Sequence, residues 1–198
     1  MTAARKKSIT AADILPIADY TKIRSEKRKA VVAIKKKRRM EVGPVATFYF
    51  ESYDTMLQQV QEMLYIEKGG DAQLVDELRA YNPLIPQGRE LVATVMFEID
   101  DPVRRTNFLN RLGGVEHTAF LKFAGETVKG VPEEDQDRTN EQGKASSVQF
   151  VHFPLSDAQA TAFKQGGQQI ILGFDHPAYA HMAVIGEETR AALAGDLD

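Results

Sequence analysis

The sequence feature that most constrains the fold is an alternating apolar pattern at residues 90–99. In the stretch ELVATVMFEI, every second residue from Leu91 to Ile99 is apolar. A period of two over this length is typical of a strand that buries one face. The chain is therefore expected to contain a sheet that covers a hydrophobic core.

Several other segments show the same signal, and they cluster into hairpins separated by short helices. The expected strands, besides 90–99, are VATFYFE, HTAFLKFAG with a partner near Thr127 and Val128, SSVQFVHFPL, QQIILGF and AYAHMAVIG. Helices are expected at residues 25–40, 53–68, 71–81, after Asp101-Pro102, after Ser156 and at 187–194, with a short helical turn before Pro16. This order predicts an α+β fold, with helices packed on a mainly antiparallel sheet of about six or seven strands.

The length of 198 residues fits a single domain spanning 1–198. Residues 1–9 carry no strong structural signal and are expected to form a flexible arm. Residues 131–145 read VPEEDQDRTNEQGKA and are expected to form an acidic loop, because they show no apolar periodicity.

The charges are distributed unevenly along the chain. Residues 1–39 hold 13 of the 25 lysines and arginines, although the whole chain has a net charge of −3. Residues 23–39, IRSEKRKAVVAIKKKRR, predict a basic N-terminal helix. This uneven distribution of charge has two interpretations. Either the basic segment is neutralised by the acidic remainder of the chain, or it forms a basic face that binds a partner.

On a helical wheel this basic helix has only a narrow apolar seam. Lys27 and Arg38 border or enter the seam, and Glu67 enters the apolar face of the following helix. Because a partly buried charge needs a partner, we expect Arg38 or Lys27 to pair with Glu67 or with Glu51. The cations at the end of the helix are the candidate docking residues for a partner: Lys35, Lys36, Arg38 and Arg39.

Motifs for catalysis are lacking in the sequence. There is no cysteine, which excludes disulfides, thiolate nucleophiles and cysteine-held metal clusters. The four histidines show no metal-ligand spacing, and the Gly-Gly pairs follow helices as C-caps and do not form phosphate loops. We therefore predict no catalytic residue, metal or cofactor. If the sheet does hold a ligand or an active site, the residues to consider are Glu51, Glu62, His152, His176 and Tyr179.

Five stretches of the sequence resemble a known family. The string LPIADYTKIRSEKRKAVVAIKKKRRMEVGPVATFYFESYDTMLQQVQEML, the stretches YNPLIP and ELVATVMFEI, and the C-terminal SSVQFVHFPLS and FDHPAY…EETRAALAGDL are similar to the bacterial family called domain of unknown function 3501. Members of that family are often encoded beside a rubrerythrin and an iron–sulfur protein similar to heterodisulfide reductase subunits. The resemblance implies an accessory role near peroxide or electron-transfer chemistry, with a rubrerythrin-like or iron–sulfur protein as partner.

Three functions are compatible with these observations. The preferred one is a non-catalytic cytoplasmic accessory protein that docks a protein partner through the basic helix. The chain has no apolar window long enough for a membrane span and no apolar segment typical of a secretory signal. The first alternative is nucleic-acid binding through the same helix, which would give a steep salt dependence. The second is a small-molecule binder or enzyme with a site on the sheet. The sequence does not indicate an oligomeric state.

Overall fold

Nine strands form two antiparallel sheets within residues 6–133 and 138–198, the parts of the chain that this computed structural model describes. The five-stranded sheet has the order β1-β2-β3-β7-β6, and the four-stranded sheet has the order β5-β4-β8-β9. The first contains β1 (Arg39–Val42), β2 (Ala46–Phe50), β3 (Glu90–Phe97), β6 (Val131–Pro132) and β7 (Val148–Pro154). The second contains β4 (Ala119–Phe123), β5 (Glu126–Lys129), β8 (Ile171–Phe174) and β9 (Met182–Val184).

The main hydrophobic core lies between these two sheets. Every second residue of β3 from Leu91 to Phe97 is buried there, which confirms the apolar face expected for this strand. Phe48 of β2 meets Phe174 of β8 across the core, with ring centroids 5.0 Å apart. Aromatic contacts of this kind bury large apolar areas and fix how the sheets face each other.

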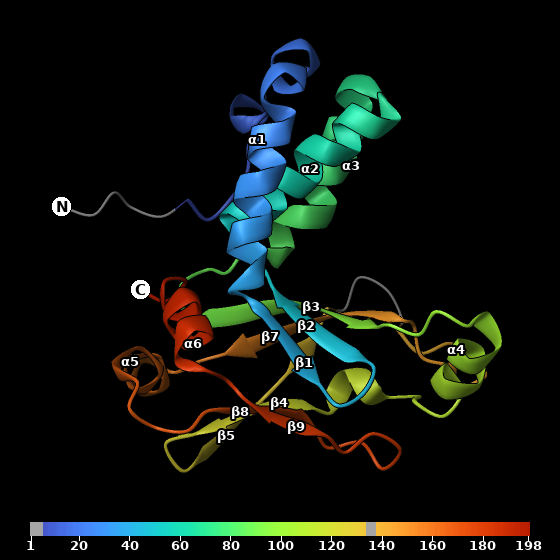
Figure 1. Cartoon of the computed structure of the whole chain (residues 1–198), viewed down its shortest axis with the longest axis vertical. Coiled ribbons are helices and arrows are strands. Elements are labelled where there is room, and N and C mark those ends of the chain that lie inside the picture. The colour runs from blue at the N-terminus through green and yellow to red at the C-terminus, as the bar shows by residue number, and fades with distance from the viewer. Residues whose placement is uncertain (1–5, 134–137) are drawn as a thin grey trace.

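The other face of the five-stranded sheet is covered by three helices, which we call the helical head: α1 (Ile17–Lys36), α2 (Tyr53–Glu67) and α3 (Gly70–Tyr81). The head stands on this sheet, opposite the four-stranded sheet (Figure 1). A second apolar cluster lies beneath it and contains Ile9, Met56, Val60, Leu64, Leu84, Ile85 and Val92. The order of layers is therefore helices, sheet, sheet.

The remaining helices lie at the two ends of the sheets (Figure 1). Helix α4 (Pro102–Leu109) lies at one end, and α5 (Asp157–Gln165) and α6 (Glu187–Ala194) lie together at the other. Three short 3₁₀ turns complete the fold: η1 (Ala11–Asp13), η2 (Asn82–Leu84) and η3 (Val115–His117). Every helix in the described residues is too short or too polar to cross a bilayer.

The α+β class and the antiparallel pairing agree with the sequence prediction, but the strand count is higher than expected. The two additional strands are β1, whose first two residues overlap the end of the expected helix 25–40, and β6, which falls inside the expected acidic loop. Both are short, and β1 is recognised only through its partner, because Met40 pairs with Phe48 and Val42 pairs with Ala46. Residues 134–137 of the expected loop lie outside the described residues.

Helix α1 begins and ends earlier than predicted. It starts directly after Pro16, whose φ of −52° suits the start of a helix. It ends at Lys36 because Lys37 closes the last turn and Arg38 leads into β1. The expected start at Ser25 is wrong, since Ser25 lies in the middle of the helix.

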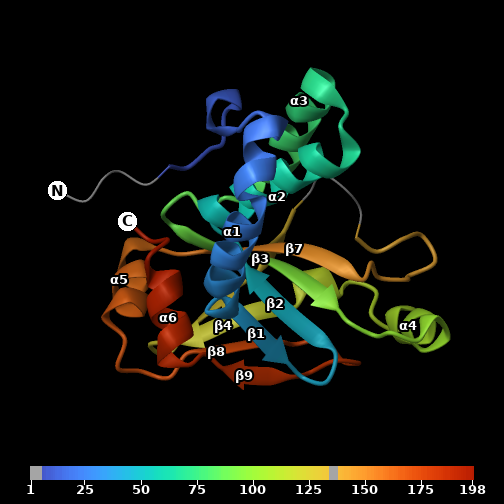
Figure 2. The ribbon, with the colours of Figure 1, turned by 45° about the horizontal axis from the view of Figure 1, so that its top comes forward.

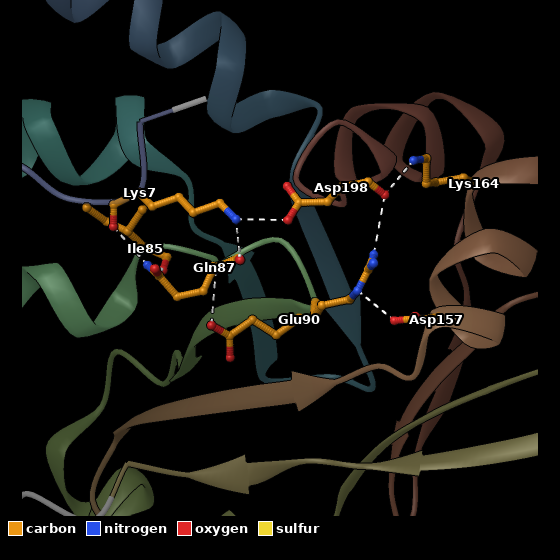
Figure 3. A network of polar contacts seen from close by, with 8 residues as sticks. Lys7, Ile85, Gln87, Glu90, Asp157, Lys164 and Asp198 are labelled. Atoms are coloured by element: carbon orange, nitrogen blue, oxygen red, sulfur yellow. Dashed lines mark hydrogen bonds and ion pairs between the residues drawn. The ribbon is translucent and has the colours of Figure 1, made fainter. Parts of the chain in front are cut away.

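The described part of the expected N-terminal arm is held by the fold. Ile9 is buried, and the side-chain amide of Asn82 bonds both its backbone groups, at 2.7 Å from N–H and 3.0 Å to C=O. Lys7 Nζ donates to the carbonyl of Gln87 and to the Asp198 carboxylate, each at 2.8 Å (Figure 3). The prediction of a flexible arm is therefore wrong for residues 7–9, and residues 1–5 lie outside the described residues.

Arg38 joins the base of the helical head to the C-terminal part of the chain. Only 6% of its surface is exposed. Its guanidinium donates to the backbone carbonyls of Phe50 at 3.0 Å, Glu51 at 2.7 Å and Ala192 at 3.2 Å. It also forms an ion pair with the buried Asp196 carboxylate. Arg38 is thus an internal cross-link, and its prediction as a docking residue is wrong.

The predicted ion pairs of the basic helix are also wrong. Arg38 contacts Glu51 only through the Glu51 backbone carbonyl, and its ionic partner is Asp196. The Glu67 carboxylate accepts from the Gln73 amide at 2.9 Å. Lys27 is exposed and forms no ion pair within the described residues.

Removing the Arg38 side chain should strongly destabilise the fold. Arg38→Ala leaves a buried carboxylate and several carbonyls without their donor, so we expect a loss of about 3–5 kcal/mol in the free energy of unfolding. Arg38→Lys should recover only part of it, because an ammonium cannot reproduce the planar fork. Urea unfolding measures the free energy of unfolding of both variants.

The matched control for this experiment is Lys37→Ala. Lys37 pairs with Glu188 at 3.4 Å on the surface, with both side chains more than half exposed, so its loss should cost less than about 1 kcal/mol. If Arg38→Ala costs no more than Lys37→Ala, the cross-linking role is wrong.

Candidate functional site

The contact between α1 and α2 is mainly polar. The Tyr20 hydroxyl donates to Glu62 and accepts from the Gln58 amide. Arg24 Nε and Nη2 bind the two Glu62 oxygens at 2.9 and 2.8 Å, and its guanidinium lies 4.4 Å from the Tyr65 ring centroid. Burial and the hydrogen bond to Glu62 raise the pKa of Tyr20 to about 12, and the Arg24 hydrogen bonds lower the pKa of Glu62. Glu62 is thus a structural anion that holds α1 on α2.

Beside this contact, cations of α1 and the first residue of β1 form a row that we call the basic stripe: Arg24, Arg28, Lys29, Lys35, Lys36 and Arg39. These residues line two adjoining surface grooves of about 570 and 540 Å³ that share Val32. Val32 is 67% exposed, although it is a β-branched apolar residue. The helix rises away from the sheets along this length (Figure 2). Three predicted docking residues, Lys35, Lys36 and Arg39, belong to the stripe.

Two tyrosines lie at the ends of the stripe. Tyr65 of α2 lines the first groove and Tyr49 of β2 lines the second. Each ring is contacted by an arginine of the stripe, since Arg24 lies 4.4 Å from the centroid of Tyr65 and Arg39 lies 5.7 Å from that of Tyr49. The sequence did not reveal these neighbours, because they come from other elements of the fold.

Glu51 lies at the base of the helical head. It follows β2 directly and precedes Ser52, the N-cap of α2. Only 5% of its surface is exposed, and its carboxylate accepts hydrogen bonds from Thr55 Oγ1 at 2.6 Å and Thr94 Oγ1 at 2.7 Å. Glu51 is among the residues that line a pocket between the head and the sheet.

His152 of β7 lies between two carboxylates. Its Nδ1 is 2.8 Å from Glu90 Oε2 and its Nε2 is 2.7 Å from Glu133 Oε1. Glu90 also accepts from the backbone N–H of Gln87 (Figure 3). Because the carboxylates contact opposite ring nitrogens, they do not converge on one point as metal ligands would. Within residues 6–133 and 138–198, no cluster of three such side chains has the arrangement of a metal site.

His176 and Tyr179 form hydrogen bonds to the backbone of turns near β9. His176 Nε2 lies 3.2 Å from the Gly113 carbonyl. The Tyr179 hydroxyl donates to the Val42 carbonyl at 2.8 Å and accepts from the Ala46 N–H at 3.0 Å, which closes the β1–β2 turn. The five residues predicted for a ligand site therefore lie in separate places, and only Glu51 lines a pocket at the base of the head.

The pH dependence of stability should report the contacts of His152. Burial lowers the pKa of His152, but the hydrogen bonds and charges of Glu90 and Glu133 outweigh it, so the pKa is raised above 6.5. A raised pKa in the folded state stabilises the fold below the unfolded pKa, and this stabilisation is lost as pH rises through the folded pKa. Urea unfolding should therefore show a larger cost of His152→Gln at mildly acidic pH than at mildly alkaline pH.

His117→Gln is the control for removing an imidazole, because His117 is exposed. Its difference from the wild type should not depend on pH in this way. A cost of His152→Gln that is constant with pH, or that grows as pH rises, would contradict the assigned contacts.

Comparison with known proteins identifies the family. Residues 8–197 match the family model described as Protein of unknown function (DUF3501). The chain is also similar to a crystal structure of a novel protein of unknown function from Burkholderia pseudomallei, with 36% identity, a TM-score of 0.89, and coverage of 96% of this chain and 100% of that one. No curated protein matches the chain. The family match spans almost the whole sequence, and the chain belongs to the DUF3501 family of proteins of unknown function.

Proposed function

We propose that this protein is a non-catalytic accessory protein that binds an acidic partner protein through the basic stripe of α1. The observation that carries this proposal is the exposure of α1. Of its 20 residues, only Tyr20 is buried. A helix in a globular domain is usually stabilised by packing an apolar face, and α1 has little of this packing.

The chemistry of the stripe favours a partner that is acidic and has an apolar side chain. Cations that follow one another along a helix face repel each other, and this repulsion destabilises the helix until opposite charge is supplied. Val32 is exposed between them and offers an apolar contact at the centre of the surface. An apolar centre with a charged rim is typical of protein interfaces, where the charges steer the encounter.

Two features favour a protein over a nucleic acid. Binding of single strands uses open aromatic rings on which bases stack, but Arg24 and Arg39 each occupy a face of the tyrosine ring next to them. The second feature is that Arg38, the most buried cation of the segment, forms its ion pair inside the fold. Nucleic-acid binding is the second candidate, supported by the density of positive charge on α1.

The family resemblance names the first partners to try. It implies a rubrerythrin-like protein or an iron–sulfur protein, and the absence of cysteine in this chain fits a protein that binds such a redox partner without holding a cluster itself. Those two proteins from the same genome, purified, are the direct ligands for a binding assay.

Charge reversal on the stripe should weaken partner binding. In the double variant Arg28→Glu with Lys36→Glu, both changed side chains are exposed, so the fold should be kept while two attractive contacts become repulsive. We expect the affinity for the partner to fall at least about tenfold, and more at low salt than at high salt. Titration calorimetry measures this with the purified partner.

The matched control is Lys122→Glu with Lys129→Glu, which changes the net charge equally on exposed residues of β4 and β5. It should bind like the wild type. The proposal fails if both double variants lose affinity equally, or if no acidic protein binds. It also fails if the wild type retains RNA or DNA with a steep salt dependence that the Arg28 and Lys36 changes abolish, since this result supports the second candidate.

A further inference from the structure

A pocket of about 350 Å³ lies between the helical head and the outer face of the five-stranded sheet. Its walls are largely apolar and include Met56 of α2, Leu84 of η2 and Phe150 of β7. Tyr81 closes one side. This volume is at the lower end of the range found for small-molecule sites. The pocket adjoins the second groove of the basic stripe, and Lys35 and Tyr49 line both.

One charged group is buried in this apolar setting. The Glu51 carboxylate accepts two hydrogen bonds, from Thr55 and Thr94, and forms no ion pair within the described residues. A carboxylate offers about four acceptor positions, so further donors can bind. The nearby N-terminus of α2 offsets part of the cost of burying this charge, but a buried anion is best stabilised by a cation.

The neighbouring cation does not supply this partner. Arg38 donates only to the backbone carbonyl of Glu51, and its charge is paired with Asp196. Burial is the main cause of the raised pKa of Tyr81; the hydrogen bond with Gln59 opposes it, and the charges of Glu77, Glu67 and Glu51 add to it.

Lys35 brings a cation to the pocket. It is partly exposed and lines both the pocket and the adjoining surface groove, so it lies at the mouth. A bound molecule would therefore meet an anion, a cation and apolar walls in one pocket. This combination suits a ligand that carries both charges and an apolar group.

The geometry points to a binding site for a free amino acid with a large apolar side chain. Its ammonium group binds Glu51, its side chain packs against Met56, Leu84 and Phe150, and its carboxylate binds Lys35. Lys35 belongs both to this site and to the basic stripe, whereas the stripe residues Arg28 and Lys36 do not line the pocket, so the Arg28 and Lys36 changes test partner binding separately from this site.

Titration calorimetry and amide chemical shifts of the full chain test this assignment with defined probes. The probes are L-phenylalanine, L-leucine, 2-phenylethylamine, which lacks the carboxylate, and 3-phenylpropionate, which lacks the ammonium. We expect the two amino acids to bind, 2-phenylethylamine to bind more weakly, and 3-phenylpropionate to bind at least about tenfold more weakly than L-phenylalanine. Shifted amides should belong to residues that line the pocket.

Two variants assign the charges. Glu51→Gln keeps the shape of the side chain and should weaken L-phenylalanine binding about tenfold or more. Lys35→Gln changes a partly exposed residue, so it should fold even if Glu51→Gln does not, and it should reduce L-phenylalanine to the affinity of 2-phenylethylamine. Lys36→Gln is the matched control outside the pocket and should bind like the wild type.

The assignment is overturned if neither amino acid binds, or if 3-phenylpropionate binds as tightly as L-phenylalanine. It is also overturned if Lys35→Gln and Lys36→Gln have the same effect. If Lys35 turns inward and pairs with Glu51, no probe will bind to the wild type. That result also contradicts the assignment.

Discussion

The buried guanidinium of Arg38 is the interaction on which the arrangement of this fold depends. Arg38 lies where α1 has ended and β1 is about to begin, and its donors reach the carbonyls at the end of β2 and in α6. Its charge is balanced by Asp196 near the C-terminus. One side chain therefore links the head, the five-stranded sheet and the last helix, and a planar group with five N–H donors suits this task better than lysine would.

This internal use of Arg38 divides the basic segment into two functional parts. Arg24 and Arg38 are held by Glu62 and Asp196, so they stabilise the head and its base. Arg28, Lys29 and Lys36 remain on the surface of α1, and Arg39 is exposed at the start of β1. The positive face is consequently presented on a helix whose lower end is fixed and whose length is largely free of the sheets, which suits the capture of an acidic partner.

The sequence was sufficient for those parts of the fold that depend on local chemistry. The alternation in β3 was visible, and so were the caps Asp101 and Ser156, each of which accepts a backbone hydrogen bond. The helical wheel also indicated correctly that Arg38 is partly withdrawn from water and needs a partner. Each of these signals comes from residues that lie within, or directly beside, the element that they predict.

The contacts that define the candidate sites could not be predicted in this way. The partner of Arg38 is 158 residues away, so a choice among nearby carboxylates was bound to miss it. His152 meets Glu90 and Glu133 only after β3, β6 and β7 have paired. The pocket at Glu51 combines residues of four helical segments and three strands, and none of them is unusual in its own stretch of sequence.

The most direct test of this account is a double-mutant cycle on Arg38 and Asp196. Urea unfolding of the wild type, Arg38→Met, Asp196→Asn and the double variant gives the coupling energy between the two side chains. The account predicts a favourable coupling of about 1–3 kcal/mol, with the double variant less destabilised than the sum of the single changes. Additive effects, with a coupling near zero, would contradict the claim that this ion pair ties the helical head to the rest of the protein.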